Sequence, residues 1–123
     1  MNTLRPTILV VDTYRDMRTY LAHCLKPLAE VQVATSGYEA LNILSHTHVD
    51  LVISELDLPT MPGHVLCKEM KVLYPDLLFV IMTSRSKYDN VRFMVEGSGY
   101  NALIYKPFEA VPFRRLIECL LIE

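Results

Sequence analysis

Short apolar runs alternate along the chain with segments in which apolar residues recur every three or four positions. Residues 8–11 form a continuous run of Ile, Leu and Val, which is typical of a strand buried on both faces. The other strand candidates are residues 31–34, 51–53, 78–82 and 102–105. The pattern therefore predicts five strands.

Between these runs, apolar residues at helical spacing predict the helices. The stripes are formed by Met17, Leu21, Cys24, Leu25 and Leu28; by Leu66, Met70 and Leu73; by Val91, Met94 and Val95; and by Phe113, Leu116, Ile117, Leu120 and Leu121. A weaker helix is expected over residues 38–45. Five strand–helix units in succession favour an α/β fold with a parallel sheet, right-handed crossovers and helices on both faces.

Polar residues follow the predicted strands, at the edge where parallel sheets of this kind place their sites. Asp12 follows the first strand, Glu55 and Asp57 follow the third, Ser84 follows the fourth, and Lys106 ends the fifth. Any one of them alone is more typical of a solvated loop. Together these five residues, which we call the rim, could hold a divalent cation and a phosphoryl group.

Four motifs resemble those of one family. Residues 8–12 resemble a hydrophobic strand that leads into an acidic pair, and residues 50–63 resemble a phosphoacceptor strand with its Pro-x-x-x-Gly loop. Residues 80–84 match a fourth strand with a terminal Ser or Thr, and residues 105–108 match a Lys-Pro-Phe signature. The whole chain thus resembles the receiver domain of two-component response regulators. The resemblance implies a five-stranded (βα)5 flavodoxin-like, doubly wound fold with strand order 2-1-3-4-5.

The resemblance also implies roles for individual residues. Glu55, four residues before Pro59, takes the place of the phosphoacceptor aspartate. Ser84, 22 residues before Lys106, takes the place of the switch hydroxyl. Lys106 takes the place of the phosphate-contacting lysine, and Leu103 stands where receivers usually carry the switch Tyr or Phe.

The same resemblance implies a weakened magnesium site. Asp12 is left as the single acid of the pair because Thr13 occupies the second position, and Asp57 is a weak further candidate ligand. The extra methylene of Glu55 moves the carboxylate outward by about 1 Å, and a misplacement of that size can cost about 10²-fold in rate. We therefore expect weakened Mg²⁺ binding and inefficient phosphorylation.

These departures favour a receiver-like protein-interaction module of two-component phosphorelay signalling that is phosphorylation-independent or phosphomimetic, and that is not an enzyme. Glu55 is expected to reach toward Lys106 and Ser84, where a phosphoryl oxygen would lie. One alternative is an atypical but functional Mg²⁺-dependent receiver, phosphorylated on Asp57 or slowly on Glu55. The other is an unrelated small α/β enzyme that uses the same rim.

Charge and hydropathy limit the partners and the location. A formal net charge of −2 offers no basic field for phosphates, so no nucleic-acid binding by this domain is expected. No apolar run approaches the ~18 residues that span a bilayer, and residues 1–6 lack the apolar segment of a signal peptide. These features predict a cytoplasmic protein without a membrane partner.

The resemblance implies a histidine kinase, an output domain or another receiver as partner. A homodimer through the fourth helix, fifth strand and fifth helix is a further expectation, with Tyr88, Arg92 and Phe93 on or near the exposed side of the fourth helix.

The chain is expected to form one domain. We assign residues 1–6 to an N-terminal tail and residues 7–123 to the receiver-like domain. Cys24, Cys67 and Cys119 are odd in number and widely spaced, without a CxxC motif. They are interpreted as small buried hydrophobic residues in a reducing compartment.

Overall fold

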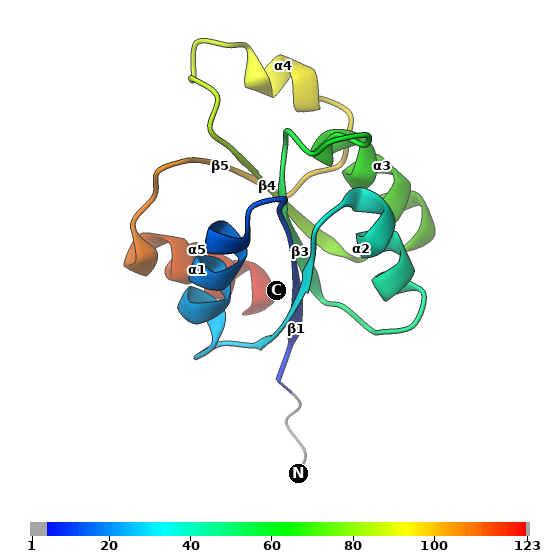
Figure 1. Cartoon of the computed structure of the whole chain (residues 1–123), viewed down its shortest axis with the longest axis vertical. Coiled ribbons are helices and arrows are strands. Elements are labelled where there is room, and N and C mark those ends of the chain that lie inside the picture. The colour runs from blue at the N-terminus through cyan, green and yellow to red at the C-terminus, as the bar shows by residue number, and fades with distance from the viewer. Residues whose placement is uncertain (1–4, 123) are drawn as a thin grey trace.

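The structure is a computed structural model that describes residues 5–122 (Figure 1). The strands are β1 (Thr7–Val11), β2 (Glu30–Ala34), β3 (Leu51–Glu55), β4 (Leu78–Thr83) and β5 (Ala102–Tyr105). The helices are α1 (Arg15–Leu25), α2 (Gly37–Leu44), α3 (Gly63–Leu73), α4 (Val91–Val95) and α5 (Ala110–Ile122). Each element overlaps the segment where the apolar pattern predicts it, although α1 ends at Leu25 and Leu28 of its predicted stripe lies in the following turn.

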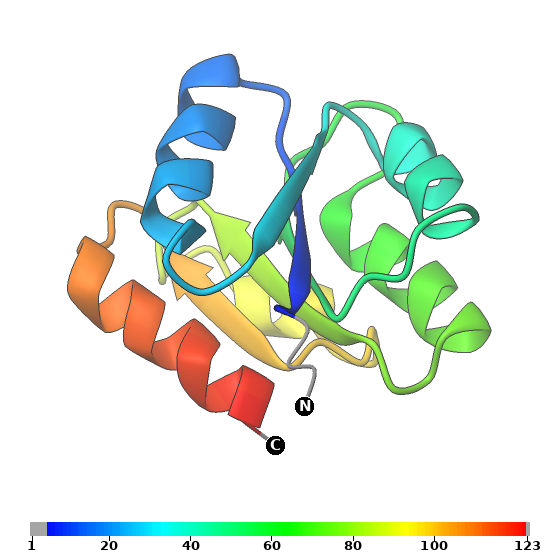
Figure 2. The ribbon, with the colours of Figure 1, turned by 90° about the horizontal axis from the view of Figure 1, so that it is seen from below.

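The five strands form one parallel sheet in the order β2-β1-β3-β4-β5, as predicted. Figures 1 and 2 show α1 and α5 on one face of the sheet and α2 and α3 on the other. Val91 and Val95 of α4 belong to the same core as α2 and α3. The doubly wound α/β fold is therefore confirmed, with β1, β3 and β4 as its inner strands.

The inner strands explain the unbroken apolar runs. Ile8 and Val10 of β1 pack against α1 and α5, whereas Leu9 and Val11 pack in the core beneath α2 and α3. All four side chains are fully buried, because successive side chains of a strand point to opposite faces and both faces are covered. The edge strand β2 is largely exposed, which is why its sequence is more polar.

Two inner strands extend further than their apolar runs. β3 continues to Glu55, which pairs with Met82, and β4 continues to Thr83, which pairs with Tyr105. Pairing with a neighbouring strand therefore includes polar residues that the apolar pattern leaves outside. Glu55 is consequently the last residue of a buried strand rather than a loop residue.

The predicted tail at residues 1–6 lies largely outside the described residues, which begin at Arg5, and Glu123 also lies outside them. The boundary between tail and domain thus stays a prediction. Within residues 5–122, no helix has the length and apolar character that a membrane crossing needs.

Two of the three cysteines are buried as expected, and the third is not. Cys24 and Cys67 lie in the two cores, whereas Cys119 is exposed on α5. The helical period explains the difference. Phe113 and Ile117 of α5 are buried, and a residue two positions beyond Ile117 lies on the far side of the helix.

We expect a thiol reagent to modify Cys119 alone in the folded protein. Burial raises the pKa of the Cys67 thiol to about 11, although its hydrogen bond to the Ser98 carbonyl acts in the opposite direction. The reactive thiolate is therefore scarce, and Cys24 is enclosed by the core. Alkylation at neutral pH followed by peptide mass spectrometry measures this, with urea-unfolded protein as the control for all three sites. Labelling of Cys67 without denaturant would contradict its burial.

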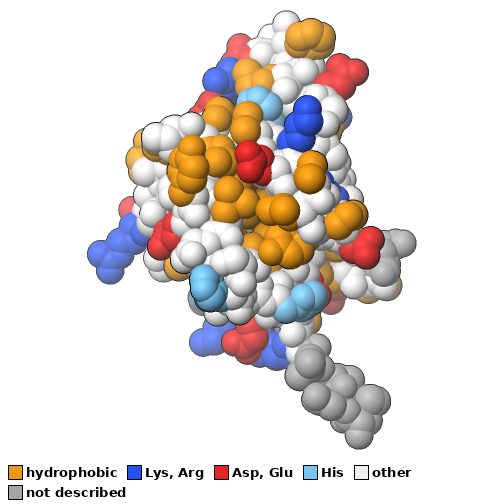
Figure 3. All heavy atoms as spheres, turned by 90° about the vertical axis from the view of Figure 1, so that its right-hand side faces the viewer, with side chains coloured by type: hydrophobic (Ala, Val, Ile, Leu, Met, Phe, Trp, Pro, Cys, Tyr) orange, Lys and Arg blue, Asp and Glu red, His pale blue; other side chains and the backbone are white. Residues whose placement is uncertain are grey.

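The face formed by α2 and α3 carries exposed apolar side chains. Figure 3 shows hydrophobic side chains gathered on this face, and Val65, Val72 and Leu73 of α3 are among the exposed ones. A hollow of about 700 Å³ lies beside them, lined by the segments that precede β3 and β4. Figure 3 therefore shows an apolar surface on the face formed by α2 and α3.

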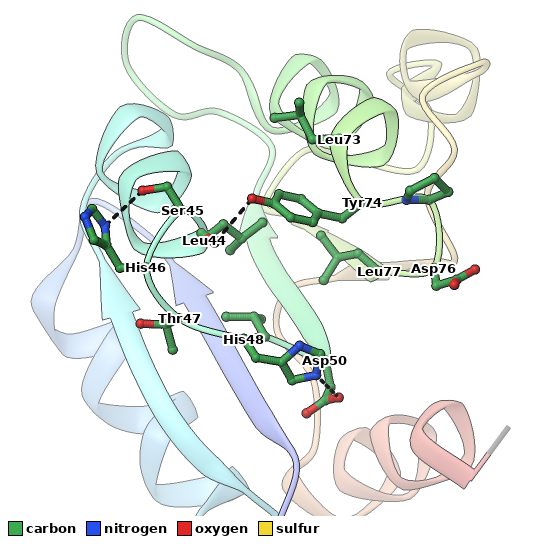
Figure 4. Close-up of a pocket in the computed structure, with 12 residues that line it drawn as sticks. Leu44, Ser45, His46, Thr47, His48, Asp50, Leu73, Tyr74, Asp76 and Leu77 are labelled. Carbon is green, nitrogen blue, oxygen red and sulfur yellow. Dashed lines mark hydrogen bonds and ion pairs between the residues drawn. The ribbon is translucent and has the colours of Figure 1, made fainter.

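Several polar groups of this hollow are paired (Figure 4). The Tyr74 hydroxyl donates to the Leu44 carbonyl at 3.3 Å, and His48 Nε2 lies 3.0 Å from Asp50 Oδ1. The segments that line the hollow precede their strands, whereas the rim residues end or follow theirs. The hollow thus lies at the opposite end of the sheet and is separate from the candidate site.

Candidate functional site

Three rim residues meet at the carboxyl ends of the strands. Asp12 directly follows β1, Glu55 ends β3, and Lys106 directly follows β5. Asp12 is fully buried, Glu55 is 7% exposed, and the Lys106 side chain is 11% exposed. The parallel order of the strands brings Asp12 and Lys106 together although 94 positions separate them in the chain.

The Lys106 ammonium contacts two carboxylates. Its Nζ donates to Glu55 Oε1 at 2.5 Å and to Asp12 Oδ2 at 3.3 Å. Burial is the largest single influence on the pKa of Lys106 and lowers it, but Glu55 and Asp12 together outweigh burial and leave this pKa above its ordinary value. Lys106 therefore stays charged at neutral pH and acts as the counter-ion of both acids.

The second oxygen of Glu55 is also engaged. The backbone N–H of Asp57 donates to Glu55 Oε2 at 2.9 Å. The carboxylate thus lies between an ammonium and a peptide N–H, and each of its oxygens has a partner. Hydrogen bonds to a charged acceptor are among the stronger ones in proteins, so they hold this buried group in one orientation.

Asp12 is held in a similar way on the other side of Lys106. Its Oδ1 accepts a hydrogen bond from the Tyr14 N–H at 2.9 Å. Arg18 of α1 donates to the carbonyls of Asp12 and Thr13 at 2.8 and 2.9 Å, a contact that the sequence reasoning missed. Thr13 itself is exposed. The loop between β1 and α1 is therefore anchored through both its backbone and its buried acid.

Asp57 faces an arginine rather than the other acids. Arg85 Nε donates to both Asp57 carboxylate oxygens at 3.1 Å, and Nη2 donates to Oδ1 at 2.8 Å. The hydrogen bond to Asp57 is the largest of the influences that raise the pKa of Arg85. Sequence reasoning missed Arg85, although a basic residue just after β4 is a signal once β3 and β4 are known to be neighbours.

Within residues 5–122, neither Ser84 nor Leu103 makes a hydrogen bond or ion pair with Glu55. Ser84 is exposed just beyond β4, and no hydrogen bond of its side chain is recorded within the described residues. The neighbouring Thr83 is buried, and its Oγ1 accepts from the Arg85 N–H at 3.0 Å. Leu103 is half-buried on the same face of β5 as Tyr105, as expected from strand alternation.

The rim carboxylates do not fit a divalent cation as they stand. Lys106 contacts Asp12 and Glu55, and Arg85 takes both oxygens of Asp57. Thr13 supplies no second acid, and within residues 5–122 no three side chains of His, Cys, Asp or Glu converge on a common point. The predicted metal ligands Asp12 and Asp57 thus each pair with a different cation of the chain.

Comparison with known proteins agrees with this architecture. The family model for the response regulator receiver domain matches residues 8–118. The sensor histidine kinase RcsC of Escherichia coli strain K12 is 33% identical over 101 residues, which are 81% of this chain and 10% of that kinase. The response regulator MprA of Mycobacterium sp. strain KMS is 31% identical over 104 residues, which are 82% of this chain and 44% of that protein. The chain therefore spans less than half the length of either relative.

Solved receiver structures have the same fold. The signal receiver domain of a signal transduction histidine kinase from Syntrophus aciditrophicus is 28% identical, with a TM-score of 0.84 over 95% of this chain and 90% of that chain. The BeF3-activated DrrB receiver domain has a TM-score of 0.89 over 98% of this chain and 100% of that chain, and at 21% identity it shows the fold alone. Receiver domains generally bind Mg²⁺ at the phosphorylation site, a pattern from which this rim departs. The chain belongs to the response regulator receiver domain family of two-component signalling.

Proposed function

We propose that the chain is a phosphorylation-independent interaction module, in which Glu55 is a permanent and partial substitute for a phosphorylated aspartate. The observation that supports this best is the contact of Glu55 with Lys106 and with the backbone N–H of Asp57. A negative group held by these donors keeps the rim in one charge state without a phosphodonor. The module acts by binding partners in the cytoplasm rather than by catalysis.

The engaged oxygens argue against efficient phosphorylation of Glu55. In phosphoryl transfer, an oxygen attacks phosphorus in line with the leaving group, while cations neutralise the developing charge. Both oxygens of Glu55 have partners, and the residue is only 7% exposed. A phosphodonor would therefore have to displace one of these partners before attack.

The mimicry is partial. Of the two contacts expected for Glu55, the one with Lys106 is present, whereas Ser84 is exposed and makes no hydrogen bond with Glu55 in the part of the chain that the structure describes. A carboxylate also carries one charge and two oxygens, against about −1.5 to −2 and three oxygens for a phosphoryl group. Leu103, in addition, has no aromatic ring to change rotamer. We therefore favour a fixed conformation over strong constitutive activation.

A histidine kinase, an output domain or another receiver is the proposed partner. Histidine kinases and response regulators are the relatives of this chain, which supports such a partner. Tyr88, just before α4, is 93% exposed, and Phe93, within α4, is 80% exposed. Together with the exposed Arg92 they form a surface that suits a partner or a homodimer through α4, β5 and α5.

A second candidate function is that of a working receiver that accepts phosphate on Asp57. The observation in its favour is exposure, because the Asp57 side chain is 46% exposed whereas Asp12 and Glu55 are buried. Against it, both oxygens of Asp57 accept hydrogen bonds from Arg85.

Incubation with acetyl phosphate and Mg²⁺, followed by intact mass measurement, tests the proposal. We expect the wild type to stay unmodified. The double variant Thr13→Asp/Glu55→Asp should gain one phosphoryl group, with acetate as the leaving group, because it restores both the acidic pair and the shorter acceptor. Glu55→Asp alone should react more slowly, since Thr13 still leaves the metal site incomplete.

A phosphorylated wild type would overturn the proposal, and mapping the modified residue would then decide between Glu55 and Asp57. Asp57→Asn is the matched control for that case, because it removes the exposed acid and leaves Glu55 intact. An inert double variant would show that more than these two positions has changed.

A further inference from the structure

Arg85 lies at one end of a continuous series of polar contacts across the rim. Its guanidinium pairs with the Asp57 carboxylate, and the Asp57 N–H donates to Glu55. Glu55 contacts Lys106, and Lys106 contacts Asp12. The loops after β1, β3, β4 and β5 are thereby linked through side chains of the chain itself.

Asp57 connects two parts of this series, one through its backbone and the other through its side chain. Its backbone binds Glu55 inside the rim, while its side chain binds Arg85 outside it. Arg85 is fixed from a second direction, because its own N–H donates to the Thr83 hydroxyl at the end of β4. A bidentate pair with a planar guanidinium restricts orientation as well as distance, which a single contact does not.

The Arg85–Asp57 pair also reduces the negative charge that the carboxylates offer to a metal ion. The three rim carboxylates, on Asp12, Glu55 and Asp57, pair with two cations. Lys106 belongs to the rim, and Arg85 lies next to it. Asp57 is the most exposed of the three acids and is thus the one that an incoming cation would reach first. Arg85 already occupies both of its oxygens.

We propose that Arg85 is a built-in counter-ion of the rim, which ties the loop of residues 84–90 to Asp57 and keeps the Asp57 carboxylate from a divalent cation. Arg85 is a positioning residue, since it acts on Glu55 only through Asp57. The inference rests on the proposed function in that it takes the rim to work with Glu55 unphosphorylated. It goes further in naming what replaces the metal ion and what holds the loop before α4.

Hydrogen exchange measured by mass spectrometry tests the loop. In Arg85→Ala we expect the amides of residues 84–90 to exchange about fivefold faster, as the loss of an exposed bidentate ion pair predicts. Asp57→Asn should have a similar effect, and the double variant should add little to either, because both single changes remove the same contact. The matched control is Arg92→Ala on α4, an exposed arginine outside the rim, which should leave these amides unchanged.

Calorimetric titration with MgCl₂ provides a readout that a purely structural role would not change. Arg85→Ala should bind Mg²⁺ about tenfold more tightly than the wild type, because it releases one carboxylate and removes one positive charge. Asp57→Asn should not gain affinity, although it loosens the same loop. Arg85→Lys keeps the charge and should exclude Mg²⁺ more effectively than Arg85→Ala.

Two results would overturn the inference. If Arg85→Ala and Arg92→Ala leave the loop amides equally protected, the pair does not hold the loop. If Arg85→Ala gains no more Mg²⁺ affinity than Asp57→Asn, Arg85 does not keep the cation out. Neither result decides whether Glu55 accepts phosphate, which the acetyl phosphate assay measures separately.

Discussion

Replacing Lys106 by methionine should lower the free energy of unfolding by about 3–5 kcal/mol, the usual cost of breaking a buried ion pair by removing one partner. The Lys106 ammonium is the shared counter-ion of Asp12, which is fully buried, and of Glu55, which is 7% exposed. Without it, two like charges face each other in a poorly solvated site. Urea denaturation at neutral pH measures the loss.

Two further variants separate charge from packing. Lys106→Met/Glu55→Gln should recover part of the loss, because it removes one of the uncompensated charges. Lys87→Met is the matched control, since Lys87 is an exposed lysine whose ammonium lies 5.7 Å from the Tyr105 ring centroid. A cost below about 1 kcal/mol for Lys106→Met, the level of an exposed ion pair, would contradict the buried role of Lys106.

The pH dependence of this variant has a definite sign. The folded pKa of Lys106 lies above its ordinary value of 10.5, so its contribution to wild-type stability is complete below that pH and is lost as the pH rises through the folded pKa. The deficit of Lys106→Met should therefore be large at neutral pH and should shrink on acidification, because a protonated carboxyl needs no counter-ion. A deficit that grows on acidification would count against this explanation.

Replacing Gly63 by alanine should lower the free energy of unfolding by about 3 kcal/mol, at the upper end of what overpacking costs. Gly63 begins α3 against the end of β3, and its N–H donates to the Leu56 carbonyl at 2.7 Å. A Cβ at this position would lie 3.0 Å from Leu56 Cα and closer still to the Glu55 carbonyl oxygen. These are backbone atoms, which cannot move aside as a flexible side chain can.

Gly97→Ala is the matched control for this prediction. Gly97 has a φ of +81° and no neighbour within 4 Å of the added Cβ, so its replacement tests backbone strain without a clash. We expect it to cost about 1–2 kcal/mol, the usual penalty of a left-handed conformation. If Gly63→Ala proved no more harmful than Gly97→Ala, the close approach of α3 to the Glu55 backbone would not be required for stability.

The contacts of Glu55 show which features of the site the local sequence pattern predicts and which it does not. Counting back from Pro59 places Glu55 at the acceptor position, and the structure places it at the end of β3 beside Lys106. The contact of Glu55 with Lys106 was expected from side-chain length, whereas the contact with Ser84 was expected and is absent within the described residues. Side-chain length limits reach, but the backbone path of the loop after β4 decides which partner lies within it.

The order of the elements, the burial of the inner strands on both faces and the residues at their carboxyl ends could all be predicted from the amino-acid sequence. These features depend on local periodicity and on the geometry common to all parallel sheets, so they follow from patterns within one amino-acid sequence. The exposed Cys119 could also have been placed from the helical period of α5, although the expectation for it was wrong.

Apart from the contact of Glu55 with Lys106, which charged side chains pair with one another could not be predicted from the sequence and depends on the folded arrangement of the strands. Asp57 pairs with Arg85, 28 positions away, rather than joining Asp12 at a metal site, and Lys106 is shared between acids that are 51 and 94 positions distant. Such contacts depend on strand order, on register and on the rotamers of long side chains, none of which is local. Two cations supplied by the chain therefore occupy the carboxylates of a rim for which the resemblance to receiver domains implies a weakened magnesium site.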